Sequence, residues 1–449
     1  MNGGFKVEGK KKKKIGKRIL LSVASLAVFA VIAAFTLLSF ATVELTAAGA
    51  PNRLRIPVLP GIGDAAIPIF VKTGDKLSIP GFLDGPIVRM NKDGSWSATW
   101  FCEDRAVSAQ GRAAVLQIEC AGESRSFTLK STGTPAAVAP MPEKVVVLSD
   151  LEGNIVFLDE ALRELGIVND AGDWQYETGH LVILGDSVDR GRDVFAVLWW
   201  LHDLAVQASA SGGAVHVVLG NHDQYMLRTN PSKANRDHIY ALNMMGGYQQ
   251  AFADETVIGH WLRQQPVLLK LGSVLFAHGG VSPDVVRSGL SVEEINSAMK
   301  AYWNTPREKQ QRSAALDAVL GHTGVTQYRG YFKGIEGRYP AASDAEIEQV
   351  LEHFEASQIV VAHTVVEQVK SLRDGRVYAV DVNSDESLPQ VLAFENGIAK
   401  VINIGVSRNI GEQDAATLRE FSLGNAADRK MLLDMYKDIG RLSALPYPY

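Results

Sequence analysis

The chain has 449 residues, of which 46% are hydrophobic and 21% are charged, so it has room for two or three globular domains. Its formal net charge of −5 gives no reason to expect nucleic acid as a partner. Its two cysteines, Cys102 and Cys120, lie outside every motif described below, which argues against a structural zinc site.

A basic cluster followed by an uncharged run marks the start of the chain. Lysine fills residues 10–14, and residues 19–43 carry no charge and are rich in Leu, Val, Ala, Phe and Ile. A helix of roughly 20 residues crosses a bilayer, and lysines before the run favour a cytoplasmic N-terminus. We therefore expect a cytoplasmic tail at 1–18, an uncleaved transmembrane signal-anchor at 19–43, and a main body on the periplasmic side of the inner (plasma) membrane. A cleaved signal with its processing site near 47–50 is the alternative.

Residues 52–130 have the pattern of a small all-β domain, in which short runs of Ile, Val, Phe and Thr alternate with turn signals. Residues 95–102 and 114–120 are predicted strands. Outside the cytoplasm, Cys102 and Cys120 could form a disulfide that closes this domain, whereas two buried thiols are the alternative. We find no catalytic motif here and interpret the domain as an accessory or binding module with an unknown partner.

The pattern changes after residues 131–143, which contain three prolines and are predicted to form a linker. Buried strands then alternate with helices, which predicts an α/β domain over 144–410. The expected strands are 144–148, 181–184, 215–219, 273–277 and 359–362, and the expected helices are 155–165, 194–207 and 345–354. Residues 411–449 have the composition of a helical extension.

Each predicted strand of this domain ends in a polar block. The blocks are SDLEGN at 149–154, GDSVDRG at 185–191, GNHD at 220–223, HGG at 278–280 and HT at 363–364. Ligands gather at the carboxyl ends of strands in α/β sheets, so we expect the five blocks to converge. One aspartate after a strand is usually a helix cap, but five such blocks in series favour a metal site. Their Asp, Glu, Asn and His side chains are hard or borderline ligands, which favours a catalytic centre accessible to water.

These motifs resemble those of the calcineurin-like metallophosphoesterases. Within that superfamily the chain is similar to the phosphoprotein-phosphatase branch, and most similar to the Shewanella-like protein phosphatases, through the runs at 165–186 and 220–227 and QYRGYF at 327–332. The resemblance covers roughly residues 144–400. It implies an α/β fold, with a metallophosphoesterase β-sandwich flanked by helices (α/β/β/α), preceded here by the transmembrane helix and the all-β domain.

The resemblance also implies a dinuclear metal centre. Asp186 would bridge two divalent ions, and the other ligands would be Asp150, Glu152, Asn221, His278 and His363. Glu152 stands where the family has histidine, so the first ion would have only carboxylate ligands. Such a set favours Mn²⁺ or Mg²⁺ over Zn²⁺; we expect Mn²⁺, with Fe, Zn or Mg as alternatives. Two histidines, His322 and His363, compete for the last ligand position, and we choose His363 because it follows an apolar strand.

The remaining implied roles concern the reaction. A metal-bridging hydroxide would attack phosphorus, His222 would protonate the leaving oxygen, and Asp189 would orient His222. The phosphate oxygens would be held by Arg190, Arg329 and Asn221.

The sequence therefore predicts a membrane-anchored, metal-dependent phosphomonoester hydrolase, and the resemblance implies a protein phosphatase. A phosphatase of small phosphorylated metabolites or nucleotides is the first alternative, because phosphoproteins are scarce in the periplasm. A non-catalytic protein that binds phosphorylated ligands is the second alternative, and Glu152 motivates it.

Overall fold

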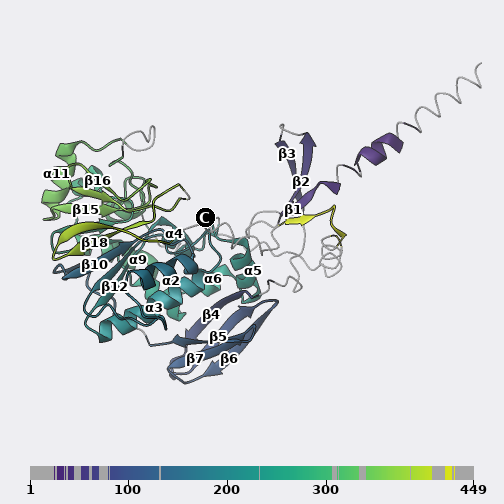
Figure 1. Ribbon diagram of the computed structural model, residues 1–449, viewed down its shortest axis with the longest axis horizontal. Coiled ribbons are helices and arrows are strands. Elements are labelled where there is room, and N and C mark those ends of the chain that lie inside the picture. Colours follow the sequence, from purple (N-terminus) through teal and green to yellow (C-terminus); the bar gives the residue numbers. More distant parts are fainter. Residues whose placement is uncertain are drawn as a thin grey trace, which may run out of the picture. The chain divides into compact units, whose positions relative to one another are not determined.

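The structure is a computed structural model (Figure 1), and it describes residues 25, 28–34, 36, 39–44, 52–59, 63–69, 79, 81–130, 133–231, 233–305, 311, 313–332, 340–384, 386–406, 420–426 and 429. The predicted basic tail, part of the predicted 19–43 span and most of the predicted 411–449 extension lie outside these residues. No helix built from the described residues has both the length and the apolar character needed to cross a membrane. The signal-anchor therefore stays a prediction.

The chain forms two compact units, and the first comprises Met1–Leu77 and Leu418–Ala444. Its sheet has the antiparallel strand order β20-β1-β2-β3, and the strands are β1 (Thr42–Glu44), β2 (Asn52–Leu59), β3 (Gly63–Ile69) and β20 (Glu420–Ser422). The unit boundary thus falls inside the predicted 52–130 domain. A strand also occupies 420–422, where we predicted helix. Both differences arise because a local sequence pattern does not identify the distant strand with which a segment pairs.

The second unit, Ser78–Thr417 with Leu445–Tyr449, contains two larger sheets. The first has the order β12-β11-β10-β18-β19, and its strands are β10 (Lys144–Leu148), β11 (His180–Leu184), β12 (Ala214–Val218), β18 (Gln390–Glu395) and β19 (Ile398–Asn403). Strands β10, β11 and β12 are parallel, while β18 and β19 add an antiparallel edge. β10 and β11 have continuous buried runs of Val, Leu and Ile, and β12 is buried along its whole length although it contains His216, as expected for strands covered on both faces.

The second sheet has the order β16-β17-β15-β14-β13-β9. Its strands are β9 (Val138–Ala139), β13 (Leu268–Leu271), β14 (Val274–Ala277), β15 (Gln358–Val361), β16 (Lys370–Leu372) and β17 (Val377–Ala379). Strands β14, β15 and β17 are parallel, so their carboxyl ends lie at the same edge. Strand β9 lies in the segment predicted as a linker and pairs with β13, so this segment also forms the edge of the sheet.

The two sheets pack face to face, with helices on their outer sides (Figure 1). Phe276 of β14 and Phe394 of β18 meet with ring centroids 6.1 Å apart, and Tyr378 of β17 also contacts Phe394. The helices are α2 (Ile155–Glu164), α3 (Val194–Ala210), α4 (Asn221–Leu227), α5 (Arg236–Met244), α6 (Tyr248–Ala251), α7 (Val257–Arg263), α8 (Pro283–Arg287), α9 (Val292–Asn304), α10 (Ala314–Leu320) and α11 (Asp344–His353). The fold is therefore mixed α/β, as predicted.

Helix α3 is apolar on almost every side because it is covered twice. It packs on β12, and it also contacts β4 and β8 of two smaller sheets. The strands of these sheets are β4 (Leu83–Met90), β5 (Trp96–Cys102), β6 (Arg105–Gly111), β7 (Val115–Cys120) and β8 (Glu123–Thr128). Trp199 of α3 donates its indole N–H to the Pro86 carbonyl at 3.0 Å and packs against Phe127. Cys102 and Cys120 form a disulfide between β5 and β7. These strands thus belong to the same unit as the larger sheets.

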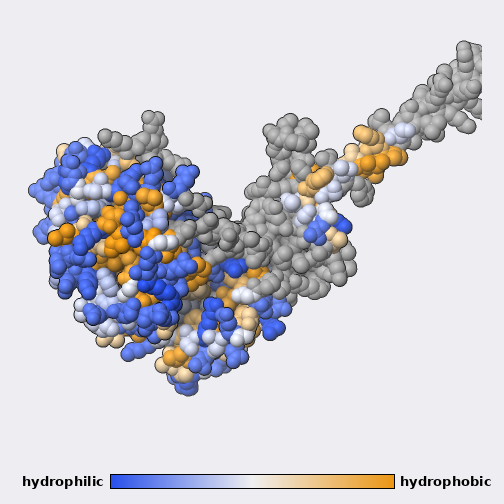
Figure 2. Space-filling model, viewed as in Figure 1, coloured by the Kyte–Doolittle hydropathy of each residue, from blue (hydrophilic) through white to orange (hydrophobic). Residues whose placement is uncertain are grey.

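The surface of the second unit is mixed in polarity. Figure 2 shows a mainly hydrophilic face that hydrophobic patches interrupt. The exposed hydrophobic side chains include Ile398 and Val401 on the edge strand β19, and Val365 and Leu388 in loops. Val365 also lines a polar cavity.

Candidate active site

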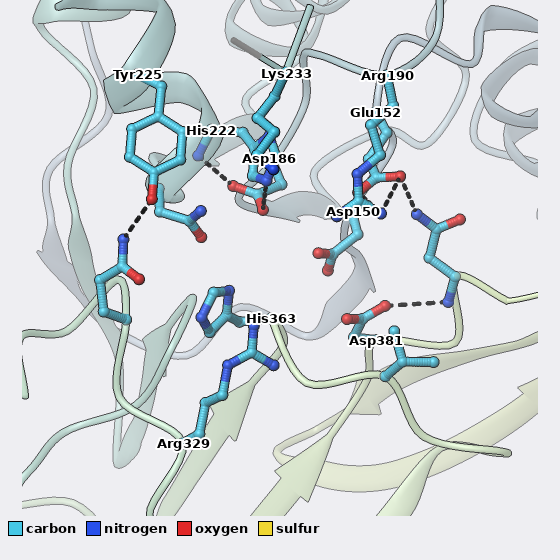
Figure 3. Close-up of a pocket in the computed structure, with 14 residues that line it drawn as sticks. Asp150, Glu152, Asp186, Arg190, His222, Tyr225, Lys233, Arg329, His363 and Asp381 are labelled. Atoms are coloured by element: carbon cyan, nitrogen blue, oxygen red, sulfur yellow. Dashed lines mark hydrogen bonds and ion pairs between the residues drawn. The ribbon is translucent and has the colours of Figure 1, made fainter. Parts of the chain in front are cut away.

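Loops that follow parallel strands of both sheets converge on one cavity of about 560 Å³ (Figure 3). The segments after β10, β11 and β12 supply one side, the last of them including α4, and the segments after α10, β15 and β17 supply the other. The lining residues are mainly polar, and they are Asp150, Glu152, Asp186, Arg190, Asn221, His222, Tyr225, Lys233, Gln327, Arg329, His363, Val365, Asp381 and Asn383. The predicted convergence of the polar blocks is therefore present in the structure.

The backbone of these loops is strained where it presents the polar side chains. Six non-glycine residues of the motifs have φ between 48° and 72°, namely Asp150, Glu152, Asp186, Asp189, Arg190 and His363. Each such conformation costs on the order of 1–3 kcal/mol and persists only where neighbouring structure enforces it. Backbone hydrogen bonds between the first two loops provide that support, since Asp150 N–H donates to the Gly185 carbonyl and Glu152 N–H to the Asp186 carbonyl. Gly185 has φ +83°, and a Cβ there would collide with the His278 ring.

Asp186 is buried at the centre of the site. Its Oδ1 accepts the His222 backbone N–H at 2.9 Å, and its Oδ2 lies 3.1 Å from His278 Nε2. Its own N–H donates to Asp223 Oδ2 at 2.9 Å, which holds the loop against α4. Burial raises the pKa of Asp186, but the facing His278 and His222 outweigh burial and lower this pKa overall. Asp186 is therefore a carboxylate at neutral pH.

A cluster of donor atoms surrounds Asp186. One ligand atom each from Asp186, His278 and His363 lie within 4.8 Å of one another. His278 Nδ1 donates to the Leu184 carbonyl at 2.8 Å, which directs Nε2 toward the cluster, where Asn221 Oδ1 lies 3.2 Å away. His363 Nε2 is buried without a hydrogen-bond partner among the described residues, and burial lowers the pKa of His363 to about 2. A neutral imidazole with a free nitrogen is the form that binds a metal ion, so these residues fit a divalent cation.

A second, carboxylate-rich group lies across the cavity from His363 (Figure 3). Asp150 and Asp381 are both buried, and burial together with the charge of Asp381 raises the pKa of Asp150 well above its usual value. Glu152 binds Arg190, with Oε1 2.9 Å from Arg190 Nη1, and Oε2 accepts Asn383 Nδ2 at 2.6 Å. Burial raises the pKa of Glu152 to about 7, although Arg190 opposes this rise. Three carboxyl groups thus share a buried space in which their negative charges are unfavourable, and a bound cation would stabilise the charged forms.

His222 is oriented by Asp189. His222 Nδ1 lies 2.9 Å from Asp189 Oδ2, and Nε2 lies 3.9 Å from Asp186 Oδ2 on the cavity side. Burial lowers the pKa of His222, but the charges of Asp186 and Asp189 outweigh burial and raise this pKa above its usual value. The imidazole can therefore carry a proton on each nitrogen and supply the one on Nε2.

Two arginines flank the cavity. Arg190 has 56% of its side chain exposed and is held by Glu152. Arg329 Nη1 donates to Thr364 Oγ1 at 3.2 Å, next to His363 in Figure 3. Both guanidinium groups can grip an anion that enters the cavity.

The structure brings together all the residues selected from the motifs. Most of them line the cavity, whereas Asp189 and His278 are buried behind its wall and contact lining residues. Of the two competing histidines, His363 lines the cavity, whereas His322 is exposed and does not. Sequence reasoning missed six lining residues, namely Tyr225, Lys233, Gln327, Val365, Asp381 and Asn383. Tyr225 lies three residues after His222 on α4, and this helical spacing was an available signal.

Residues 143–367 match the family model of the calcineurin-like phosphoesterases. The chain is 22% identical over 291 residues to Shewanella-like protein phosphatase 1 of Plasmodium berghei (strain Anka), an alignment that covers 59% of this chain and 75% of that protein. It is 29% identical over 155 residues to the symmetrical bis(5'-nucleosyl)-tetraphosphatase of Vibrio vulnificus (strain CMCP6), covering 30% of this chain and about half (51%) of that protein.

A solved structure is also similar. The crystal structure of a cold-active protein-tyrosine phosphatase of a psychrophile Shewanella species superposes with a TM-score of 0.65 at 29% sequence identity. The match covers 71% of this chain and 99% of that chain.

Proposed function

The chain belongs to the calcineurin-like phosphoesterase family and is a phosphatase-type enzyme, and we propose that it hydrolyses phosphomonoesters with two divalent cations, acting as a protein phosphatase. The observation that carries the proposal is the His222–Asp189 pair beside a cluster of metal-binding donors. A protein that only binds phosphorylated ligands would need no proton donor for a leaving group, which argues against the non-catalytic alternative.

The donor set supports the metal requirement. Asp186 would hold both cations, with Asn221, His278 and His363 on one side and Asp150 on the other. Bound divalent ions supply Lewis-acid activation of the phosphate and of the attacking water. Because the cavity lining contains four carboxylates and no cysteine, Mn²⁺ is the ion we propose.

The chain's own groups account for the rest of the reaction. Arg190 and Arg329 bind the phosphate oxygens and orient the ester. The Asp189 carboxylate keeps Nδ1 of His222 protonated through the 2.9 Å contact, so Nε2–H faces the cavity. As the P–O bond breaks, Nε2 gives its proton to the leaving oxygen, and the product is an alcohol or a phenol rather than its anion.

The apolar part of the cavity supports an aromatic substrate. The Tyr225 ring lies beside His222, with ring centroids 5.5 Å apart, and Val365 is half exposed at the cavity. A phenolic leaving group that receives a proton from His222 would lie against such a wall. We therefore propose phosphotyrosyl protein as the preferred substrate, in keeping with the name of the Shewanella structure.

One observation favours a second candidate. Lys233 adds a third basic side chain to the cavity lining, beside Arg190 and Arg329. Three basic side chains are more than a single phosphate group needs, and they suit a substrate with several linked phosphates. A nucleotide-type substrate, as in the name of the Vibrio relative, is the alternative.

Phosphate release from a substrate panel tests the proposal. The purified chain is stripped with a chelator and assayed with and without added Mn²⁺ on p-nitrophenyl phosphate, a phosphotyrosyl peptide, a phosphoseryl peptide and a dinucleoside tetraphosphate. We expect Mn²⁺-dependent hydrolysis, fastest for the phosphotyrosyl peptide among the peptides. Equal rates with and without Mn²⁺ would overturn the metal mechanism, and turnover of the tetraphosphate alone would favour the nucleotide candidate.

We further propose that the second unit works outside the cytoplasm, anchored by residues 19–43. The lysines at 10–14 and the Cys102–Cys120 disulfide support this location, because disulfides persist in oxidising compartments. Protease accessibility of the unit in intact spheroplasts is the test. Protection of the full chain would contradict an extracytoplasmic location.

A further inference from the structure

The Glu152 carboxylate already accepts hydrogen bonds from other side chains of the protein. Its two carboxylate oxygens lie 2.9 Å and 3.2 Å from Nη1 of Arg190, and Oε2 also accepts Nδ2 of Asn383 at 2.6 Å. Only 4% of the Glu152 side chain is exposed, whereas 56% of the Arg190 side chain is exposed. The geometry is that of a buried carboxylate that holds a more exposed guanidinium in place, and a cation bound to Glu152 would compete with Arg190.

Asp381 is a second buried carboxylate at the same end of the cavity. It follows β17, which pairs in parallel with β15, and β15 leads directly to His363. Figure 3 shows the Asp381 carboxylate in the cavity near that of Asp150. Its Oδ1 accepts the Asn383 backbone N–H at 3.1 Å, and this short Asp381-to-Asn383 turn directs the Asn383 amide to Glu152. Asp381 thus presents a carboxylate to the space that Asp150 also faces.

Asp150 and Asp381 both line the cavity, and Figure 3 shows their carboxylates close together, so the two groups repel each other when both are charged. Only 2% of Asp381 and 4% of Asp150 is exposed, so water screens the repulsion poorly. A divalent cation between the two carboxylates would convert this repulsion into attraction. Glu152 does not need a bound cation in the same way, because Arg190 already neutralises its charge.

We propose that Asp381 is a direct ligand of the cation held by Asp150 and Asp186, and that Glu152 is a positioning residue for Arg190 instead of a metal ligand. The inference rests on the proposed two-cation site and assigns roles within it to Asp381 and Glu152. Three carboxylates, Asp150, Asp186 and Asp381, would then bind one cation, which keeps the preference for hard ions such as Mn²⁺.

Mn²⁺ binding to the full chain tests the ligand assignment. Titration calorimetry and metal analysis after dialysis are compared for wild type, Asp381→Asn, Glu152→Gln and the control Asp374→Asn, which alters an exposed carboxylate just before β17. We expect Asp381→Asn to weaken one of two Mn²⁺ sites at least tenfold, and the other two variants to keep both sites within about twofold of wild type. Wild-type affinities in Asp381→Asn, or loss of a site in Glu152→Gln, would overturn the assignment.

The positioning role of Glu152 is tested by a double-mutant cycle. Inorganic phosphate affinity of the Mn²⁺-loaded protein is measured for Glu152→Gln, Arg190→Gln and the double variant. If Glu152 acts through Arg190, Glu152→Gln changes the affinity in the wild-type background but by less than about twofold in the Arg190→Gln background. Equal effects in both backgrounds would refute the positioning role.

A crystal of wild type grown with Mn²⁺ covers the case in which Asp381→Asn fails to fold. Anomalous scattering locates the ions, and an Asp381 oxygen within about 2.5 Å of one is expected. An ion ligated by Glu152 and not by Asp381 would refute the inference. Phosphate release by the same wild-type protein separates the two proposals. Two bound Mn²⁺ ions without hydrolysis would overturn the proposed function alone. Hydrolysis by a protein in which Glu152 ligates the ion would overturn this inference alone.

Discussion

Asp189→Asn removes one charge from the site and keeps its shape. In the wild type, Asp189 Oδ2 and His222 Nδ1 are 2.9 Å apart, and both side chains are buried. A hydrogen bond to a charged group contributes about 1.5–3 kcal/mol, and about 1.4 kcal/mol corresponds to a factor of ten in rate. Because the pair stabilises the protonated imidazole that serves as the acid, we expect kcat to fall by about 10- to 150-fold.

The leaving group provides the sharper assay. p-Nitrophenol leaves readily as an anion, whereas phenol needs a proton from His222 as the ester bond breaks. The loss of kcat in Asp189→Asn should therefore be larger for phenyl phosphate than for p-nitrophenyl phosphate, at equal Mn²⁺ content. Asp170→Asn, at an exposed position, is the control and should keep both rates. Identical losses for the two esters would refute the assignment of His222 as the acid.

Three further predictions concern stability and metal content. Burial lowers the pKa of His202 from 6.5 to about 4, so only the unfolded chain gains a proton as the pH falls through this window. The wild type should lose about 3 kcal/mol of unfolding free energy more than His202→Leu between these pH values in urea titrations, and parallel pH profiles would contradict this. Replacing Cys102 and Cys120 with serine should lower the unfolding free energy by about 3 kcal/mol in the same assay, because the disulfide closes a sequence separation of 18 residues. Phosphatase activity should persist because neither cysteine lines the cavity, and an unchanged unfolding midpoint would count against the prediction. A Cβ at Gly220 would collide with Asp186 Oδ1, so Gly220→Ala should lower bound Mn²⁺ in metal analysis, and full occupancy would disprove the collision.

The central strands could be predicted because each of them coincides with one short run of apolar residues in the sequence. Residues 144–148 were predicted to the residue, and 181–184 differs from β11 by one position, since consecutive Val, Leu and Ile permit little else. The polar blocks could also be located, because each begins where such a run ends. The disulfide was one of two open alternatives, and the structure contains it.

The remaining features depend on distant partners. Strand β9 has two residues between prolines, and only its pairing with β13 makes it a strand. The strands within 52–69 lie in the span predicted to be all-β, yet their grouping with a C-terminal strand has no local signal. Asp381 follows a three-residue strand without a recognisable run, so its place beside Asp150 emerges only from the order of the second sheet.

Phosphate release by wild type and His222→Asn, at matched Mn²⁺ content, tests most directly whether the cavity is a phosphomonoesterase site. The account predicts Mn²⁺-dependent hydrolysis of phenyl phosphate by wild type and a rate about 10²- to 10⁴-fold lower for His222→Asn, with both proteins binding equal Mn²⁺. Equal rates for the two proteins would contradict it.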